Sequence, residues 1–181
     1  LVQTRSALLD LALARGYPAG DCQRIAQVCD LAAVLMNGCY RPCGRPFVAH
    51  LVGTAGVLVR YGFRIEVVLA GLLHAAYTHC PRLPAGPKSS IETVCDALGG
   101  RGSPLERRVR AYSRRGEDLR TLASYAGRAG ELGVDDAEIV AMTAANDVDM
   151  ELGGEYRYTG RERLGDGAIA LIREVCALLG V

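Results

Sequence analysis

The chain has 181 residues, half of them hydrophobic, and its 21 Lys and Arg nearly balance its 20 Asp and Glu, which leaves a formal net charge of +1. This balance argues against general electrostatic attraction to nucleic acid or to an anionic membrane. The length favours one domain over residues 1–181. There is no uninterrupted apolar run of membrane-spanning length and no signal-peptide pattern, so we expect a cytoplasmic protein without membrane or nucleic-acid partners. The oligomeric state stays open.

The origin of the chain is suggested by its composition. Lys88 is the only lysine, and Gly and Ala are abundant, which favours a GC-rich bacterial genome. The chain starts at Leu1 rather than Met, which leaves room for a preceding segment.

Helical periodicity dominates the first half of the sequence. Apolar residues predict helices over residues 3–15, 21–37, 47–61 and 65–77. Asn37-Gly38 is expected to end the second helix, because glycine adopts the left-handed conformation common after helices. The fourth helix is apolar on nearly every face and is therefore expected to be central and buried.

The second half predicts further helices and no alternating strand. Prolines recur through residues 80–90 and exclude a regular helix there. Capping-box patterns start at Ser89, Ser103 and Asp135. We predict helices over residues 90–99, 104–115, 117–131, 135–152 and 166–179, with a glycine-rich loop at 153–165. The fold class is therefore all-α, a compact bundle of about seven to nine helices.

Seven cysteines are spread through the helical patterns. Cys29 and Cys176 occupy core phases of their helices and are expected to be reduced core residues. Cys39 and Cys43 are four residues apart, and no second pair accompanies them. A structural zinc site is therefore not expected there.

All three histidines, His50, His74 and His79, lie within one thirty-residue stretch. The string Arg41-Pro-Cys-Gly-Arg-Pro-Phe-Val-Ala-His50, followed by Gly71-Leu-Leu-His74-Ala75, resembles the HD-domain superfamily of metal-dependent phosphohydrolases. It is most similar to the hydrolase domain of Rel/Spo-type enzymes that degrade the alarmone (p)ppGpp, over residues 20–152. This resemblance implies a helical domain in which histidines from two successive helices and an Asp from a later helix bind a metal that activates water.

The sequence departs from that family at its acidic positions. Ala75 stands where the family has the Asp of its His-Asp pair, and Thr78 and His79 replace a Glu-Asp pair that drives hydrolysis there. In the segment 139–150, which resembles the family's last-ligand helix, Asn146 stands at the ligand position. We therefore expect the usual metal-dependent phosphohydrolase activity to be lost.

Metal binding is not favoured by the ligands that remain. Two imidazoles and one amide carry no charge for Mg²⁺ or Mn²⁺. Asp149, three residues after Asn146 on the same helical face, is the best substitute acid. The alternative to a metal-free site is Zn²⁺ or Fe²⁺ held by His50, His74 and Asp149, supporting hydrolysis or oxygen chemistry.

The leading hypothesis is a divergent HD-like enzyme that acts on a small polar or anionic molecule by acid–base chemistry, in a bacterial biosynthetic setting suggested by analogy alone. The candidate catalytic residues are His50, His74 and His79, with residues 80–90 as a lid beside His79. The substrate-binding candidates are Arg41, Tyr77 and Asn146; in the resembling family, an Arg at the position of Arg41 contacts the nucleotide base.

Simpler roles remain open for several of these residues. The simpler role for His79 is that of a surface residue, and the simpler role for Tyr77 is that of a packing residue. Arg41 is alternatively the ion-pair partner of an acid. Asn146 is alternatively a hydrogen-bond partner of His74 in an inert site. A solvated helix face is the alternative role for Asp147, Asp149 and Glu151. An ion-paired helix surface is the alternative for the six arginines of 101–115. A non-catalytic nucleotide or small-molecule binding module is the third hypothesis for the whole chain.

Overall fold

The computed structural model describes residues 2–79, 90–115, 125, 127–159 and 166–181. These residues form an assembly of helices without strands, so the predicted all-α class is confirmed. Eight helices have eight or more residues, and two more, α5 and α10, have four residues each. The predicted helix over 117–131 lies mostly outside the described residues, and its last part is a 3-10 turn at Ala129–Glu131.

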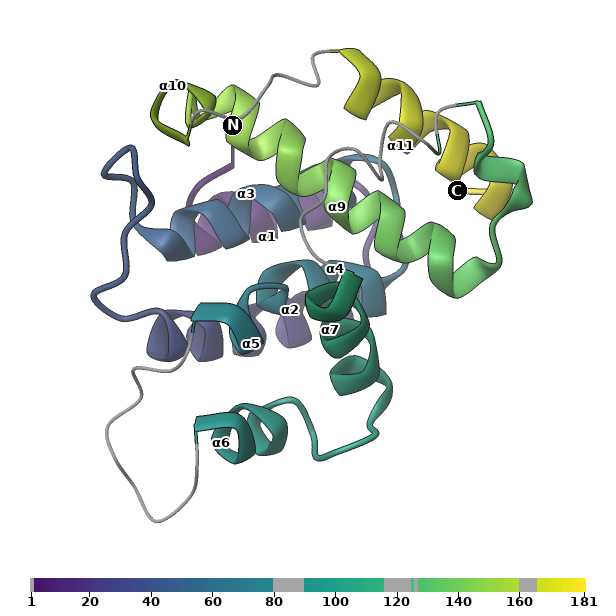
Figure 1. The fold of residues 1–181 in the computed structure, drawn as a ribbon. Coiled ribbons are helices and arrows are strands. Elements are labelled where there is room, and N and C mark those ends of the chain that lie inside the picture. The colour runs from purple at the N-terminus through teal and green to yellow at the C-terminus, as the bar shows by residue number, and fades with distance from the viewer. Residues whose placement is uncertain (1, 80–89, 116–124, 126, 160–165) are drawn as a thin grey trace.

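The first five helices cover the four that the sequence predicts, the last of which is divided into α4 and α5 (Figure 1). They are α1 (Arg5–Ala14), α2 (Ala19–Leu35), α3 (Phe47–Arg60), α4 (Ile65–Leu73) and α5 (Ala76–His79). Gly38 follows α2 with a φ of 72°, which is the left-handed conformation that the Asn-Gly pair predicted.

The remaining helices are α6 (Ser90–Ala97), α7 (Pro104–Arg115), α9 (Val134–Leu152), α10 (Tyr156–Thr159) and α11 (Asp166–Leu179). The segment predicted as the loop 153–165 thus contains one helical turn, α10. In Figure 1, α9 crosses the molecule diagonally between α3 and α11. It packs against both of them, and α3 also packs against α4.

The core is built around α3, α4 and α9. Every residue of α4 except Glu66 is buried, as its all-round apolar pattern predicts. The described part of the chain contains no helix with the length and apolarity needed to cross a membrane.

The helix predicted over residues 65–77 is interrupted at His74. α4 ends at Leu73, and α5 starts two residues after His74. The His74 Nδ1 atom lies 2.7 Å from the carbonyl oxygen of Gly71. In a continuous helix this carbonyl would accept from the backbone of Ala75, so the imidazole takes a hydrogen bond that the helix needs to continue.

The capping boxes have different outcomes. Ser103 Oγ accepts from the backbone N–H of Glu106 at 3.1 Å, as predicted. The prediction of a capping box at Asp135 is wrong, because the N-cap of α9 is Gly133, which makes no side-chain capping hydrogen bond. Glu138 instead binds Arg64 and Arg108. Ser89 lies outside the described residues.

The cysteines expected in the core are buried. Cys29 is 3% exposed and Cys176 is 8% exposed. Burial raises the pKa of Cys29 to about 11 and also raises the pKa of Cys176, so both thiols stay protonated at neutral pH. This agrees with the expectation of unreactive core thiols.

Candidate functional site

The His50 and His74 rings meet between α3 and the end of α4. Their centroids are 5.2 Å apart and their planes are nearly perpendicular. Both side chains are buried, with exposures of 0% and 2%. Phe47, one turn before His50, packs edge-on against the His50 ring at 5.7 Å. The structure therefore brings two of the three candidate histidines into one buried environment.

The His50 ring is oriented by Asp149 of α9. His50 Nδ1 lies 2.6 Å from Asp149 Oδ2. Arg45 Nη2 lies farther from the same nitrogen, at 3.3 Å. An ionised carboxylate only accepts hydrogen bonds, so the shorter contact with Asp149 indicates that His50 Nδ1 carries the donated proton. Arg45 holds the same carboxylate with both Nη atoms, one of them 3.2 Å from Oδ1. Burial raises the pKa of Asp149, and the opposing influence of Arg45 is smaller.

Gly53 makes room for Asp149. It lies one turn after His50 on α3, and a Cβ atom placed there would be 1.8 Å from Asp149 Oδ1. No non-hydrogen atoms approach that closely without a bond, so any other residue at this position would displace the carboxylate. Gly53 is thus the residue that permits contact between α3 and the Asp149 side chain.

A second buried carboxylate, Glu155, holds the two arginines of the 41–45 loop. Arg41 donates to it from Nε and Nη2 at 2.8–3.0 Å, and Arg45 Nη2 lies 3.3 Å from Oε1. The Cys43 thiol donates to Oε1 at 3.5 Å. Burial acts to raise the pKa of Glu155, but Arg41 and Arg45 together hold it below its usual value. Glu155 is therefore ionised at neutral pH.

These contacts form one buried, charge-balanced network. Two arginines face two carboxylates, and the side chains of both arginines are 9% exposed while those of both acids are 0% exposed. With His50 neutral, the charges of this network cancel. A proton taken up by His50 would give the network a net positive charge in a region of low dielectric, where charges interact strongly.

His74 is fixed by a different partner. Its Nδ1 contacts the Gly71 carbonyl, which can only accept, so Nδ1 carries the proton. Its ring also packs against Tyr112 of α7, with centroids 5.1 Å apart. In both histidines Nδ1 is therefore the protonated nitrogen of the neutral ring, and Nε2 is the nitrogen with basic character.

Three of the buried polar atoms near this region that lack a protein partner within the described chain are Arg45 Nε, Asn146 Oδ1 and Thr54 Oγ1. The Arg45 side chain is 9% exposed, and Asn146 and Thr54 are 1% and 0% exposed. Asn146 Nδ2 donates to Asp147 Oδ1 at 3.2 Å and lies 3.5 Å from Met150 Sδ. Buried polar atoms without partners are uncommon and indicate a bound water or ligand group. The interpretation of Asp147 and Asp149 as a solvated face is wrong, because both are buried.

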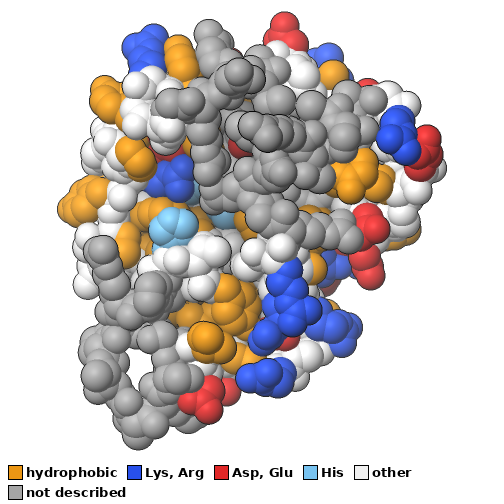
Figure 2. All heavy atoms as spheres, viewed as in Figure 1, with side chains coloured by type: hydrophobic (Ala, Val, Ile, Leu, Met, Phe, Trp, Pro, Cys, Tyr) orange, Lys and Arg blue, Asp and Glu red, His pale blue; other side chains and the backbone are white. Residues whose placement is uncertain are grey.

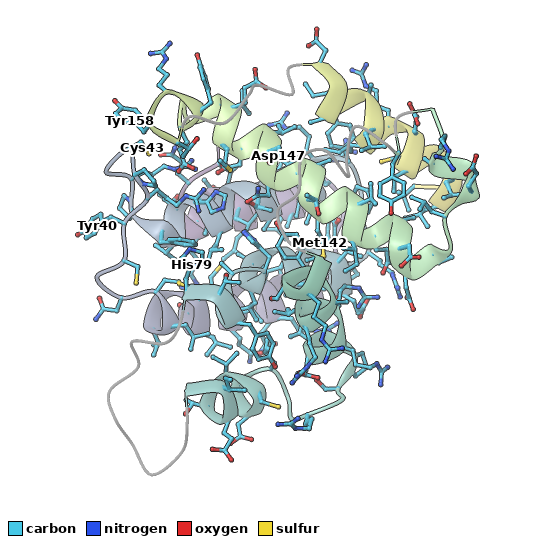
Figure 3. All side chains as sticks on the ribbon, in the orientation of Figure 1. Tyr40, Cys43, His79, Met142, Asp147 and Tyr158 are labelled. Atoms are coloured by element: carbon cyan, nitrogen blue, oxygen red, sulfur yellow. The ribbon has the colours of Figure 1, made fainter. Side chains whose placement is uncertain are left out.

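His79 and Tyr77 on α5 lie apart from this pair. His79 is partly exposed, and its ring packs on Phe47 with a centroid distance of 4.6 Å. Figure 3 shows it between the ribbons of α3 and α5, and histidine is visible among apolar side chains on the face shown in Figure 2. The Tyr77 hydroxyl donates to Glu106 at 2.6 Å. Tyr77 therefore lies in a cluster with Glu106 and Arg110.

Arg41 takes the simpler of its two expected roles. Its guanidinium binds Glu155 and lies 5.0 Å from the centroid of the Phe47 ring. The arginines of 101–115 also follow the simpler interpretation where the structure describes a pair. Arg108 binds Glu138, and Arg110 binds Glu106.

The geometry does not fit a metal held jointly by His50, His74 and Asp149. Asp149 receives the Nδ1 proton of His50, so it lies on the side of the ring opposite Nε2, the nitrogen with the lone pair. It is also bound by Arg45, whose cation competes with a metal for the carboxylate. Within the described residues, no group of three or more His, Cys, Asp and Glu side chains is placed to hold an ion.

The sequence analysis missed four residues that shape this site. Arg45 stood inside the recognised string, Gly53 follows His50 by one helical turn, and Glu155 and Tyr112 come from other parts of the chain. The spacing of Gly53 on the His50 face of α3 was the one local signal available. Glu155 had none, because it lies beyond the segment that resembles the family.

Comparison of the chain with protein-family models, with curated proteins and with solved structures gave no match.

Proposed function

We propose that this chain is a divergent HD-like enzyme that acts on a small polar or anionic molecule by acid–base chemistry at His50 and His74. The observation that carries the proposal is the meeting of the two imidazoles, each with its Nδ1 fixed by an acceptor. A carboxylate that fixes one tautomer and stabilises the imidazolium is the arrangement that makes histidine an effective general base. Asp149 has that relation to His50.

The chemistry of such a site needs one group to accept a proton and a neighbour to donate one. His50 has the Asp149 carboxylate at its Nδ1 and takes the role of the base, since a nearby anion stabilises an imidazolium. His74 has a neutral carbonyl at its Nδ1 and takes the role of the acid that returns the proton. Two neighbouring imidazoles also resist double protonation, so the pair holds one proton more readily than two.

Access to the pair is expected on the side of His79. Phe47 contacts both the buried His50 ring and the partly exposed His79 ring, so it separates the pair from the surface there. A substrate reaches His50 by displacing Phe47 or by a movement of the loop that precedes α3. The lid expected from residues 80–90 lies outside the described residues, apart from the first residue of α6.

The experiment is a turnover screen with matched variants. Purified protein is incubated with a panel of small polar metabolites, including nucleotides and (p)ppGpp, and consumption is followed by mass spectrometry. We expect a consumed substrate whose turnover falls about 100-fold or more in both His50→Asn and His74→Asn. Arg128→Gln, at the exposed Arg128–Glu131 pair, is the control and should keep full activity. Turnover that survives both histidine changes overturns the proposal.

A non-catalytic binding module is the second candidate. Two observations favour it: His50 is completely buried, and the charges of Arg41 and Arg45 are compensated by those of Asp149 and Glu155. The side chains of this site therefore have their charges satisfied within the protein. Ligands that raise the melting temperature in the same panel and are recovered unchanged would support it. Stoichiometric zinc or iron in protein purified without chelators, lost in His50→Ala, would instead support the metal-dependent alternative.

A further inference from the structure

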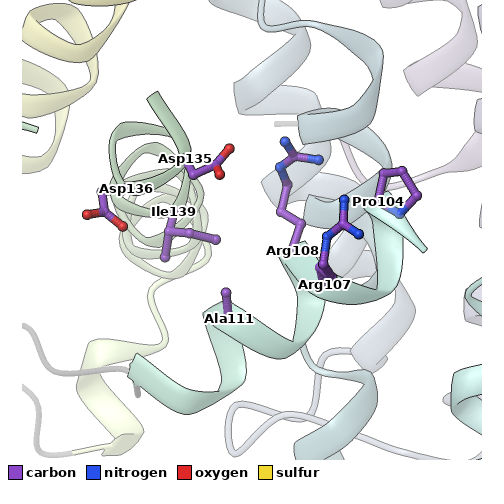
Figure 4. Close-up of a pocket in the computed structure, with 7 residues that line it drawn as sticks. All are labelled: Pro104, Arg107, Arg108, Ala111, Asp135, Asp136 and Ile139. Carbon is purple, nitrogen blue, oxygen red and sulfur yellow. The ribbon is translucent and has the colours of Figure 1, made fainter. Parts of the chain in front are cut away.

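A cavity of about 220 Å³ lies between α7 and the first turns of α9, away from the histidines (Figure 4). Arg107 and Arg108 of α7 line one side, and Asp135 and Asp136 of α9 line the other. Asp136 and Asp149 are thirteen residues apart on α9, which separates the cavity from the histidine site by about 20 Å along the helix. The two sites share a helix but no side chain.

The basic side of the cavity is held in place. Arg108 donates from Nε and Nη2 to Glu138 at 3.0 and 2.6 Å, and its side chain is 11% exposed. Glu138 is 1% exposed and also binds Arg64. One carboxylate thus serves two guanidinium groups, and the exposed Arg107 donates to the Gly102 carbonyl at 2.6 Å. A fixed cation binds an anionic group at a lower entropic cost than a mobile surface side chain does.

The acidic side is open to solvent. Asp135 is exposed and Asp136 is partly exposed, at the first turn of α9. Their charges suit the positive end of the helix dipole, which accounts for acids there without a ligand. The dipole does not account for the cavity that separates them from two arginines. Between the charged sides, Ala111 and buried Ile139 give the cavity an apolar part.

We propose that this cavity binds a small zwitterion, such as a free amino acid, with its anionic group at Arg107 and Arg108 and its ammonium group at Asp135. A molecule that carries both charges can contact the basic side and the acidic side at once, whereas a singly charged ligand can contact only one of them. The volume equals that of about seven waters, which suits a molecule of about eight non-hydrogen atoms. This proposal is independent of the chemistry at His50.

The test uses four five-carbon probes that differ only in charge. Norvaline and 5-aminopentanoate carry both charges at different separations, pentanoate carries only the anion, and pentylammonium carries only the cation. Binding to the full chain is measured by calorimetry and by the melting temperature. We expect at least one zwitterion to bind about tenfold or more tightly than both singly charged probes. Equal binding of a singly charged probe, or no binding of either zwitterion, overturns the proposal.

Variants assign the binding to this cavity. Asp135→Asn changes an exposed residue and is expected to fold normally while reducing the affinity for the zwitterion to that for pentanoate. Arg108→Lys keeps the positive charge beside Glu138 but loses the planar fork, and is expected to weaken binding about tenfold. Arg101→Gln removes an exposed arginine of the preceding turn and is the matched control with unchanged affinity. Full affinity in both Asp135→Asn and Arg108→Lys would overturn the assignment.

Discussion

The two ends of α9 each bury a carboxylate against α3 or α7, but they surround it with different partners. Near the N-terminus, Glu138 is bound by Arg64 and Arg108. Near the C-terminus, Asp149 is bound by Arg45 and His50. Arginine stays charged at all accessible pH values, so the positive charge of the two arginines in the Glu138 cluster does not change with pH. The Asp149 cluster instead contains a histidine, the residue type whose ordinary pKa lies closest to neutral pH, so it holds a side chain of the kind used for proton transfer and the Glu138 cluster does not.

The largest effect is expected from Gly53→Ala, which would break the Asp149 cluster by steric conflict alone. The added Cβ would lie 1.8 Å from Asp149 Oδ1, so the carboxylate must leave Arg45 and His50. We expect a loss of about 4 kcal/mol or more in the free energy of unfolding, measured by urea denaturation. Gly20→Ala is the control, because that helical glycine has open space around it. It should lie within about 1 kcal/mol of wild type, and an equally small effect at Gly53 would contradict the packing described here.

The comparison is sharpened by neutralising each carboxylate in turn. Asp149→Asn leaves buried Arg45 with less compensation and is expected to cost about 3 kcal/mol. Glu138→Gln should cost about 1–2 kcal/mol, because the half-exposed Arg64 recovers solvation from water and Arg108 keeps Asp135 across the adjacent cavity. Urea denaturation of both variants checks this order. A larger loss in Glu138→Gln would show that the Glu138 cluster, not the Asp149 cluster, dominates the stability of α9.

Acid should weaken the network around His50 through Glu155. Its folded-state pKa lies below its usual value because Arg41 and Arg45 outweigh the effect of burial. An acid with a lowered pKa contributes stability above the unfolded pKa of about 4.3, and this stability is lost as pH falls through the folded value. Asp149 has a raised pKa and therefore acts in the opposite direction, at pH values above its unfolded pKa of about 3.9.

The measurement is urea denaturation of wild type and Glu155→Gln at pH 7 and at about pH 3, which lies below the unfolded pKa of the carboxyl group. The variant should be less stable than wild type at pH 7, and the difference should shrink on acidification, because the variant has no carboxylate to lose there. A difference that is unchanged between the two pH values would mean that Glu155 stabilises the chain through packing rather than through its charge.

The smallest effect is expected at a third buried carboxylate, Glu106, which accepts from Tyr77, Arg110 and the Gly102 backbone. Tyr77→Phe removes one of these donors and should cost about 1 kcal/mol, because the others remain. Thermal denaturation checks this value. A Tyr77→Phe variant with unchanged stability but altered ligand binding would return Tyr77 to the substrate-binding role that the sequence suggested.

Local patterns in the sequence were sufficient for the helices but not for the side-chain partners. Apolar periodicity predicted α3, α4, α9 and α11 within a few residues, because burial of one face determines each helix. It could not predict the break at His74, since that break depends on where one imidazole points. The pairing of His50 with Asp149 joins residues 99 positions apart. Asp149 was noted as an acid on the right face, but its capture by Arg45 depends on the tertiary structure.

The position of Glu155 has a practical consequence for any shortened version of the protein. The resemblance suggested by the sequence covers residues 20–152, and a fragment trimmed to residue 152 would remove the anion that holds Arg41 and Arg45. Arg41 and Arg45 would then share Asp149 as their one remaining counter-charge within this network. The 41–45 loop would be expected to move outward into water. A minimal piece that retains the native surroundings of His50 must therefore extend through the turn after α9.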